Sequence, residues 1–81
     1  SEATKNVGVK DYKTVLQEKL QIHGNVLIEY KIVHESGPDH NKTFEVEVHL
    51  NSNVIGKGKG GSKKSAEQAA AREALKLMGV I

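Results

Sequence analysis

Residues 56–74 read GKGKGGSKKSAEQAAAREA, and three features coincide in this stretch. Four of the chain's 12 Lys and Arg residues fall within eight positions of it, at 57, 59, 63 and 64. No Asp or Glu occurs between Glu47 and Glu67, so four lysines without an acid make the local charge +4, whereas the whole chain carries +2. Glycines keep the backbone slim just before an alanine-rich helix is expected to begin.

The lysine pair Lys63-Lys64 breaks a local rule of helix formation. The first turn of a helix carries a partial positive charge, which favours acidic side chains. Two lysines at this place indicate an external anion, bound jointly by the lysines and by free backbone N–H groups. The alternative is a solvated basic loop in front of a surface helix.

Length and composition limit the possible classes of protein. A chain of 81 residues predicts one domain with a small core. The absence of cysteine excludes a disulfide framework and a thiolate metal site, and it favours a reducing cytosol. No apolar run is long enough to span a membrane. Because the chain starts with Ser1 and its only methionine is Met78, we expect that it was processed or excised from something longer.

Hydrophobic periodicity predicts two helices and three strands within a domain at residues 10–79, preceded by a linker from an upstream domain at residues 1–9. The helices are expected at 11–23 and 62–78, and the strands at 27–35, 43–50 and 54–59, with a tight turn at 51–53. Apolar side chains define the inward face of each helix. These are Tyr12, Val15, Leu16 and Leu20 in the first helix, and Ala66, Ala69, Ala70, Ala74 and Leu77 in the second.

Short connections between consecutive strands make the expected sheet antiparallel. Each strand has one apolar face, so both helices should cover that same face. The predicted fold is α+β with the order α-β-β-β-α, a three-stranded antiparallel sheet and both helices packed on one face. The polar face of the sheet is then expected in water, with Glu29, Lys31, Glu45, Glu47 and His49.

Several nucleotide-binding motifs fail on this chain. The GxGxxG at 56–61 lacks the parallel strand and the later acid of a dinucleotide site, and Gly61 is not followed by the lysine of a Walker motif. Residues 58–61 also match the GxxG loop of KH domains, but that loop joins two helices, whereas a strand is expected before residues 58–61 here. A single-strand reader of the RRM type needs exposed aromatic residues on its sheet, where Glu, Lys and His are expected.

Metal-dependent and nucleophilic catalysis are not indicated. The four histidines have no ligand spacing, and only His40 is singled out, because it lies at the tip of a turn-rich loop. Glu45 and Glu47 share one strand face and could hold a divalent ion, but no further acid or base is tied to them, so a solvated sheet face is favoured. No nucleophile–base arrangement occurs.

A nucleic-acid interpretation remains. Lysines at a helix start suit phosphates, which carry no sequence information. The polar face of the first helix offers hydrogen-bonding groups rather than cations, namely Thr14, Gln17, Glu18 and Gln21. Phosphates would repel Glu18, so this face suits a hydroxyl-rich surface such as the minor groove of A-form RNA.

The stretch GKGKGGSKKSAEQAAAREAL resembles the end of the double-stranded RNA-binding domain, whose hallmark is Gly-x-Gly, a short spacer and Ser-Lys-Lys-x-Ala. The stretches DYKTVLQEKLQ and SGPDHNKTFEVEV are similar to the version of this domain at the C-terminus of bacterial ribonuclease III. The resemblance covers residues 10–79 and uses three motifs in the family's order.

The resemblance implies a role for each motif in binding duplex RNA by shape, over about 16 base pairs. Thr14, Gln17, Glu18 and Gln21 would enter one minor groove, and the loop with Pro38 and His40 would enter the next. Phosphates of the intervening major groove would be bridged by Lys63 and Lys64, with Lys59, Ser62 and Ser65 nearby. Many members have a further lysine where Glu67 or Gln68 stands here, and this departure implies weaker binding by the isolated domain.

The resemblance also implies a parent enzyme. Ribonuclease III is a Mg²⁺-dependent endoribonuclease specific for double-stranded RNA, and its nuclease half would lie upstream of Ser1. The parent is expected to be cytoplasmic and to dimerise through that half. The present chain is expected to bind double-stranded RNA without being an enzyme and without a cofactor, a membrane or a small-molecule substrate. Two alternatives remain, a protein–protein interaction module on the same fold and a self-sufficient nuclease.

Overall fold

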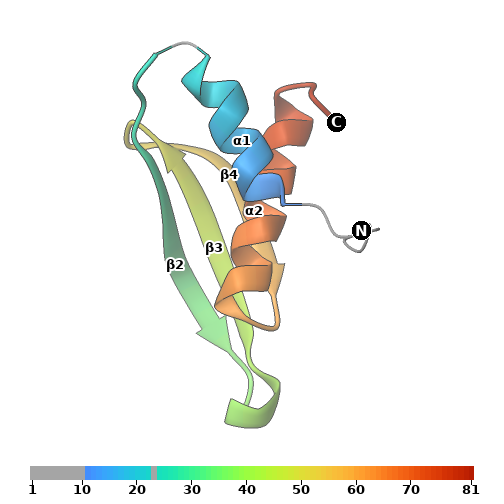
Figure 1. The fold of residues 1–81 in the computed structure, drawn as a ribbon. Helices are drawn as coiled ribbons and strands as arrows, with labels where there is room; N and C mark the ends of the chain where they lie inside the picture. The colour runs from blue at the N-terminus through green and yellow to red at the C-terminus, as the bar shows by residue number, and fades with distance from the viewer. Residues whose placement is uncertain (1–10, 23) are drawn as a thin grey trace.

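The structure, a computed structural model, describes residues 11–22 and 24–81, so the predicted linker at residues 1–9 lies outside the described residues. The elements follow in the predicted order: α1 (Tyr12–Gln21), β2 (Ile28–Ser36), β3 (Thr43–Leu50), β4 (Asn53–Gly60) and α2 (Lys63–Leu77). The strands form one antiparallel sheet in the order β2-β3-β4. Both helices cover the same face of this sheet, as Figure 1 shows. The predicted fold class is confirmed.

Helix α1 is shorter than the predicted range of 11–23. It begins after the N-cap Asp11, whose side chain accepts a hydrogen bond from the Thr14 N–H at 3.2 Å, and it ends at Gln21. The expected last residue, His23, lies outside the described residues. This cap places the start of α1 within one residue of the predicted start at 11.

The connections between the strands also follow the predicted pattern. Asn51 and Ser52 both have positive φ, 50° and 76°, as the two-residue turn of a tight hairpin requires. The loop between β2 and β3 is more ordered than predicted, because it contains a short 3-10 turn, Asp39–Asn41. This turn is closed by a hydrogen bond from the Asn41 N–H to the Pro38 carbonyl at 2.9 Å.

The core lies between the sheet and the two helices. Its buried apolar residues are Leu16, Leu20, Val46, Val48, Ala66, Ala70, Ala71, Ala74 and Leu75. The prediction that Leu77 lines the packed side of α2 is wrong, since Leu77 is 71% exposed while Leu75 is fully buried. Leu77 instead lines an open hollow beside the start of β4, together with Val54 and Ile55.

Alternate glycines of β4 allow α2 to pack closely against the sheet. A Cβ on Gly56 would lie 2.7 Å from the carbonyl oxygen of Ala70, and a Cβ on Gly60 would lie 2.7 Å from the backbone nitrogen of Ala66. A Cβ on Gly58 would overlap the backbone of Ala70 outright. Backbone therefore packs on backbone along this strand, and the glycines are needed for helix packing rather than for an approaching ligand.

Two bulges adjust the sheet. Val33 is the extra residue of β2, and Ile55 is the extra residue of β4, because Val54 pairs with His49 and Gly56 pairs with Val48. The second bulge lets Ile55 pack against the core while the glycines still face α2.

The prediction for the polar face of the sheet is only partly right. Lys31 is exposed, but the side chains of Glu47 and His49 keep only 20% and 13% of their surface in solvent. Their burial follows from mutual contact, since His49 Nε2 lies 3.1 Å from Glu47 Oε1. Lys31 and Lys57 flank Glu47 on the neighbouring strands, and the Lys57 Nζ lies 3.8 Å from Glu47 Oε2.

The hairpin of β2 and β3 reaches past the helices, and the loop at 37–42 forms its tip (Figure 1). Lys42 holds the base of the tip, with Nζ 3.3 Å from Glu35 Oε1 and 3.9 Å from Asp39 Oδ1. The loop is thereby presented as a protruding element at the far end of the molecule from the α1–β2 connection.

Candidate nucleic-acid interface

The outward face of α1 carries the side chains predicted for the minor groove. Leu16 and Leu20 point into the core, which turns Thr14, Gln17, Glu18 and Gln21 outward, and all four are exposed. The Thr14 hydroxyl donates to Asp11 Oδ2 at 2.7 Å, so its proton is already used while its oxygen can still accept. This face offers hydrogen-bonding groups without a free cation.

The first turn of α2 combines exposed lysines with backbone N–H groups that lack partners inside the helix. Ser62 caps the helix, and its Oγ accepts from the Ser65 N–H at 3.1 Å. The next N–H, of Ala66, donates to the Ser62 carbonyl at 2.9 Å, so Lys63 and Lys64 carry the uncapped N–H groups of this turn. The first turn contains no acidic residue, and both lysine side chains are exposed. The predicted placement of both lysines in the first turn is confirmed.

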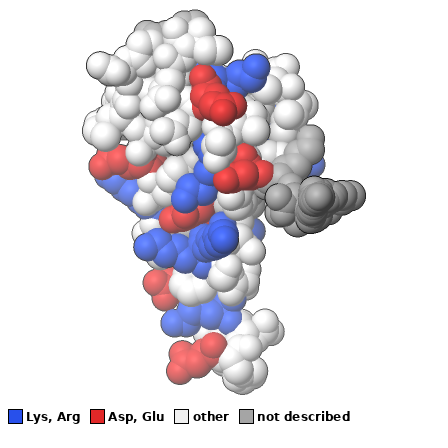
Figure 2. All heavy atoms as spheres, viewed as in Figure 1, with Lys and Arg blue, Asp and Glu red and all other residues white. Residues whose placement is uncertain are grey.

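The third predicted element is the tip of the β2–β3 hairpin. Pro38 and His40 are both exposed there. In Figure 1 the first turn of α2 lies between α1 and this tip along the length of the molecule. Figure 2, in the same view, shows Lys and Arg side chains gathered over the lower half of this face, interspersed with acids.

Lys59 is the one predicted phosphate-binding residue that the structure sets apart. Its strand neighbours Gly58 and Gly60 face α2. Successive side chains of a strand point to opposite faces, so Lys59 leaves the sheet on the face away from α2. It pairs across the sheet with Glu45, whereas Ser62, Lys63, Lys64 and Ser65 lie at the start of the helix.

A hollow of about 300 Å³ between α1 and α2 joins two of the predicted groups. We call it the interhelix hollow. Thr14 and Gln17 of α1 line it together with Lys64 of α2, and Asp11, Lys13 and Gln68 complete its wall. A minor-groove residue and a phosphate-binding residue of the predicted site thus share one surface, although 47 to 50 positions separate them in the sequence.

A network that the sequence analysis missed ties α1 to α2 behind this hollow. Lys13 Nζ lies 2.7 Å from Glu67 Oε1 and 4.8 Å from the centroid of the Tyr30 ring. Gln68 contacts the start of α1 through its side-chain amide, described below. No local signal points to these contacts, because the partners lie 54 to 57 residues apart. The pairing also removes Lys13 as a free cation on α1.

This network shifts the pKa values of Asp11 and Tyr30. The hydrogen bond from Gln68, followed by those from Thr14, lowers the pKa of Asp11 from 3.8 to about 2, so Asp11 stays ionised. Burial, followed by the charges of Glu67 and Asp11, raises the pKa of Tyr30 to about 12. The phenol therefore stays protonated and neutral beneath the Lys13 ammonium group.

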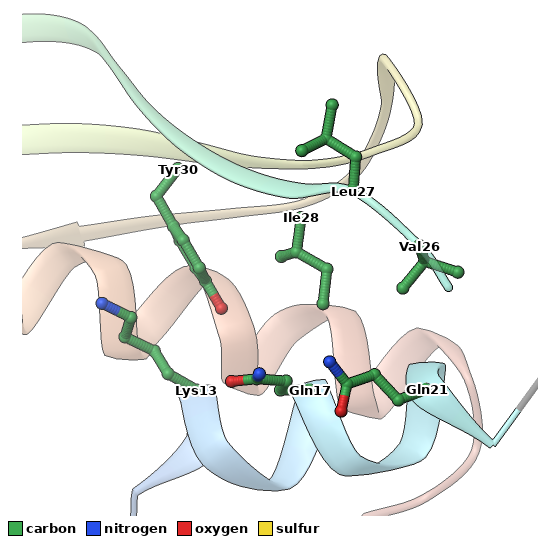
Figure 3. A pocket seen from close by; sticks show the side chains of 7 residues that line it. All are labelled: Lys13, Gln17, Gln21, Val26, Leu27, Ile28 and Tyr30. Atoms are coloured by element: carbon green, nitrogen blue, oxygen red, sulfur yellow. The ribbon is translucent and has the colours of Figure 1, made fainter. Parts of the chain in front are cut away.

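A second hollow of about 280 Å³ lies between α1 and the edge strand β2 (Figure 3). Lys13, Gln17 and Gln21 of α1 face Val26, Leu27, Ile28 and Tyr30 across it. Gln17 lines both hollows, so its side-chain amide is accessible from two sides.

Within residues 11–22 and 24–81, no group of three or more His, Cys, Asp or Glu side chains could hold a metal ion. The carboxylate of Glu47 is engaged by His49 and Lys57 instead. In this same part of the chain, no helix has the length and apolar character needed to cross a membrane.

Comparisons with known proteins show the family of this chain. Residues 12–78 match the sequence profile of a family described as "Double-stranded RNA binding motif". The chain is 58% identical over 67 residues to a protein named Ribonuclease 3 from Streptococcus agalactiae serotype Ia, covering 83% of this chain and 29% of that relative.

Two further relatives carry the same name. The protein from Streptococcus mutans serotype c is 56% identical over 70 residues, covering 86% of this chain and 30% of the relative. The protein from Streptococcus pyogenes serotype M5 is 57% identical over 67 residues, covering 83% and 29%. The chain therefore spans less than a third of the length of the curated relatives it matches.

Proposed function

The chain belongs to the double-stranded RNA binding motif family, and from this premise we propose that it binds A-form duplex RNA by shape rather than by sequence. The observation that carries the proposal is the interhelix hollow, where Thr14 and Gln17 of α1 lie beside Lys64 of α2. Groups that can hydrogen-bond to ribose hydroxyls and a lysine that can bind a phosphate therefore lie on one surface, where a single duplex can contact both.

The proposed binding uses three elements in succession. The side chains of α1 enter one minor groove, where the ribose 2′-OH groups both donate and accept hydrogen bonds. Lys63 and Lys64, with the N–H groups of the first turn of α2, meet phosphates across the intervening major groove. Pro38 and His40 at the hairpin tip enter the next minor groove. Such a module spans about 16 base pairs.

Selectivity for RNA over DNA then has a physical source in α1. The four side chains of the predicted minor-groove face are two amides, a hydroxyl and a carboxylate, Lys13 is paired with Glu67, and the other exposed lysine of α1, Lys19, lies in its last turn outside this set. A face without its own cations gains little from phosphates and depends on hydrogen bonds to 2′-OH groups, which DNA lacks. The lysines of α2 supply the salt-dependent affinity without sequence information.

We further propose that the chain is the substrate-binding part of a ribonuclease III-type endoribonuclease in the cytoplasm. Identity of 58% to a protein named Ribonuclease 3 supports this assignment. Mg²⁺ chemistry and dimerisation would belong to a nuclease domain of the parent enzyme. The chain itself would bind RNA and leave cleavage to that domain.

A gel-shift titration tests the function. The chain is titrated against a duplex RNA of about 20 base pairs, with DNA duplex of the same sequence and single-stranded RNA as controls. Salt-sensitive binding to the RNA duplex alone is expected. Equal binding to both duplexes would reduce the site to a generic basic patch, and no binding to either would favour a protein-interaction module. Cleavage of the duplex after addition of Mg²⁺ would contradict the assignment of cleavage to another domain.

A further inference from the structure

The start of α1 is held by a side chain from the other helix. Gln68 Oε1 accepts a hydrogen bond from the Tyr12 N–H at 2.7 Å and a second from the Lys13 N–H at 3.3 Å. Gln68 Nε2 donates to Asp11 Oδ1 at 2.9 Å. The first N–H groups of a helix lack partners inside the helix, so this amide and the Asp11 cap together satisfy the first turn of α1.

We propose that Gln68 is a positioning residue for RNA binding, because its amide sets the separation between the minor-groove face of α1 and the phosphate-binding turn of α2. This inference rests on the proposed function. Gln68 stands four residues after Lys64 on α2, so the two side chains lie on the same face of the helix. Both line the interhelix hollow with Thr14 and Gln17.

The polar atoms of Gln68 are engaged within the protein. Its carbonyl oxygen receives two hydrogen bonds from α1, and its amino group donates to Asp11. The oxygen therefore has no acceptor capacity left for a ligand, and one of the two N–H groups of the amide is used by Asp11. Gln68 therefore acts on RNA through the placement of α1. The ion pair between Lys13 and Glu67, at 2.7 Å, is a second tie between the same helices.

The two kinds of RNA contact differ in their tolerance of displacement. Hydrogen bonds to 2′-OH groups weaken steeply with distance and angle, whereas a lysine attracts phosphates over a Debye length of about 10 Å at 0.1 M salt. A small shift of α1 relative to α2 should therefore reduce the hydrogen bonds of α1 more than the phosphate contacts of α2. The expected signature is lower selectivity for RNA over DNA at an unchanged salt dependence.

The test compares Gln68→Met with the wild type in binding to duplex RNA and to DNA of the same sequence over a range of salt. Methionine keeps the length and helix propensity of glutamine but removes its donor and acceptor. We expect RNA affinity to fall roughly three- to tenfold, equivalent to one or two hydrogen bonds, while DNA affinity and the log–log salt slope stay nearly the same. An unchanged RNA-to-DNA ratio overturns the proposal.

A matched control separates positioning from stability. Val48→Ala creates a cavity in the core at a β3 residue that is not a hydrogen-bond partner of Gln68, and it should lower stability while leaving the RNA-to-DNA ratio of the folded protein intact. Both variants are measured where circular dichroism shows them folded. A fall of the ratio in Val48→Ala as large as in Gln68→Met would overturn the proposal, since any loss of stability would then suffice.

A second variant covers the case in which Gln68→Met does not fold, and the wild-type result separates this inference from the proposed function. If Gln68→Met does not fold, the comparison is made with Gln68→Glu, which keeps the acceptor for the Tyr12 N–H but repels Asp11. An unchanged ratio in that variant overturns the proposal equally, and a reduced ratio supports it. Wild-type protein that binds RNA and DNA duplexes alike overturns the proposed function and this inference with it. Wild-type selectivity that survives in the Gln68 variants overturns this inference alone.

Discussion

Gly58 of β4 lies directly beneath Ala70 of α2, so close that a Cβ on the glycine would overlap the backbone of the helix. Gly56 and Gly60, two residues before and two residues after Gly58 on β4, make the same kind of close contact with α2. The GxGxG run at residues 56–60 is thus the surface on which α2 packs. It determines the position of the first turn of this helix, with Lys63 and Lys64, relative to the sheet.

Gly58→Ala is expected to lower the free energy of unfolding by about 3 kcal/mol, because the helix and strand backbones must move apart to admit a methyl group. Urea denaturation measures the change. Gly61→Ala is the matched control, since no atom lies within 4 Å of its added Cβ, and it should change stability by about 0.5 kcal/mol or less. Equal effects in the two variants would contradict this role of the glycine run.

Ala70→Glu is expected to leave the domain unfolded. Ala70 is fully buried, and an unpaired buried charge costs about 3–5 kcal/mol, much of the stability of a small domain. Circular dichroism and thermal unfolding give the measurement. Leu77→Glu places the same charge in the same helix at a residue that is 71% exposed, so it should fold normally. A folded Ala70→Glu variant would show that the packing face of α2 is misassigned.

Lys64→Ala should weaken binding to every RNA duplex alike and flatten the log–log salt dependence by about one unit, because one phosphate contact is lost. Binding titrations at several salt concentrations provide the slope. Lys59→Ala removes the same charge on the opposite face of the sheet and should change the slope much less. If Lys64→Ala altered sequence preference instead, its assignment to phosphate would be wrong.

Acid should weaken the attachment of α1 to α2 through Asp11. The pKa of Asp11 is lowered in the folded state from 3.8 to about 2, chiefly by the hydrogen bond from Gln68. A lowered folded-state pKa stabilises the fold above the unfolded-state value, and this contribution is lost as the pH falls from 3.8 through about 2. Carboxyl NMR titration measures the pKa directly. In Gln68→Met it should move back towards 3.8, and an unchanged value would exclude Gln68 as the main cause.

Local sequence determined the elements of this fold and part of its site. The alternation of Phe44, Val46 and Val48 predicts a strand at 43–50, and β3 has these bounds. The caps Asp11 and Ser62 begin the helices where short polar side chains can accept from the third N–H of each helix. Such signals act over a few residues, and packing does not change them.

Tertiary structure alone decided how these elements meet. The partnership of Gln68 with Asp11, and that of Lys13 with Glu67, join residues 54 to 57 positions apart, and no local pattern marks them. The exposure of Leu77 has the same origin, because helical periodicity alone does not show that it lines an open hollow beside β4 and is not part of the closed core. The sequence alone therefore places the residues proposed to contact RNA on helices, turns and strands. Long-range packing decides which of them share a surface.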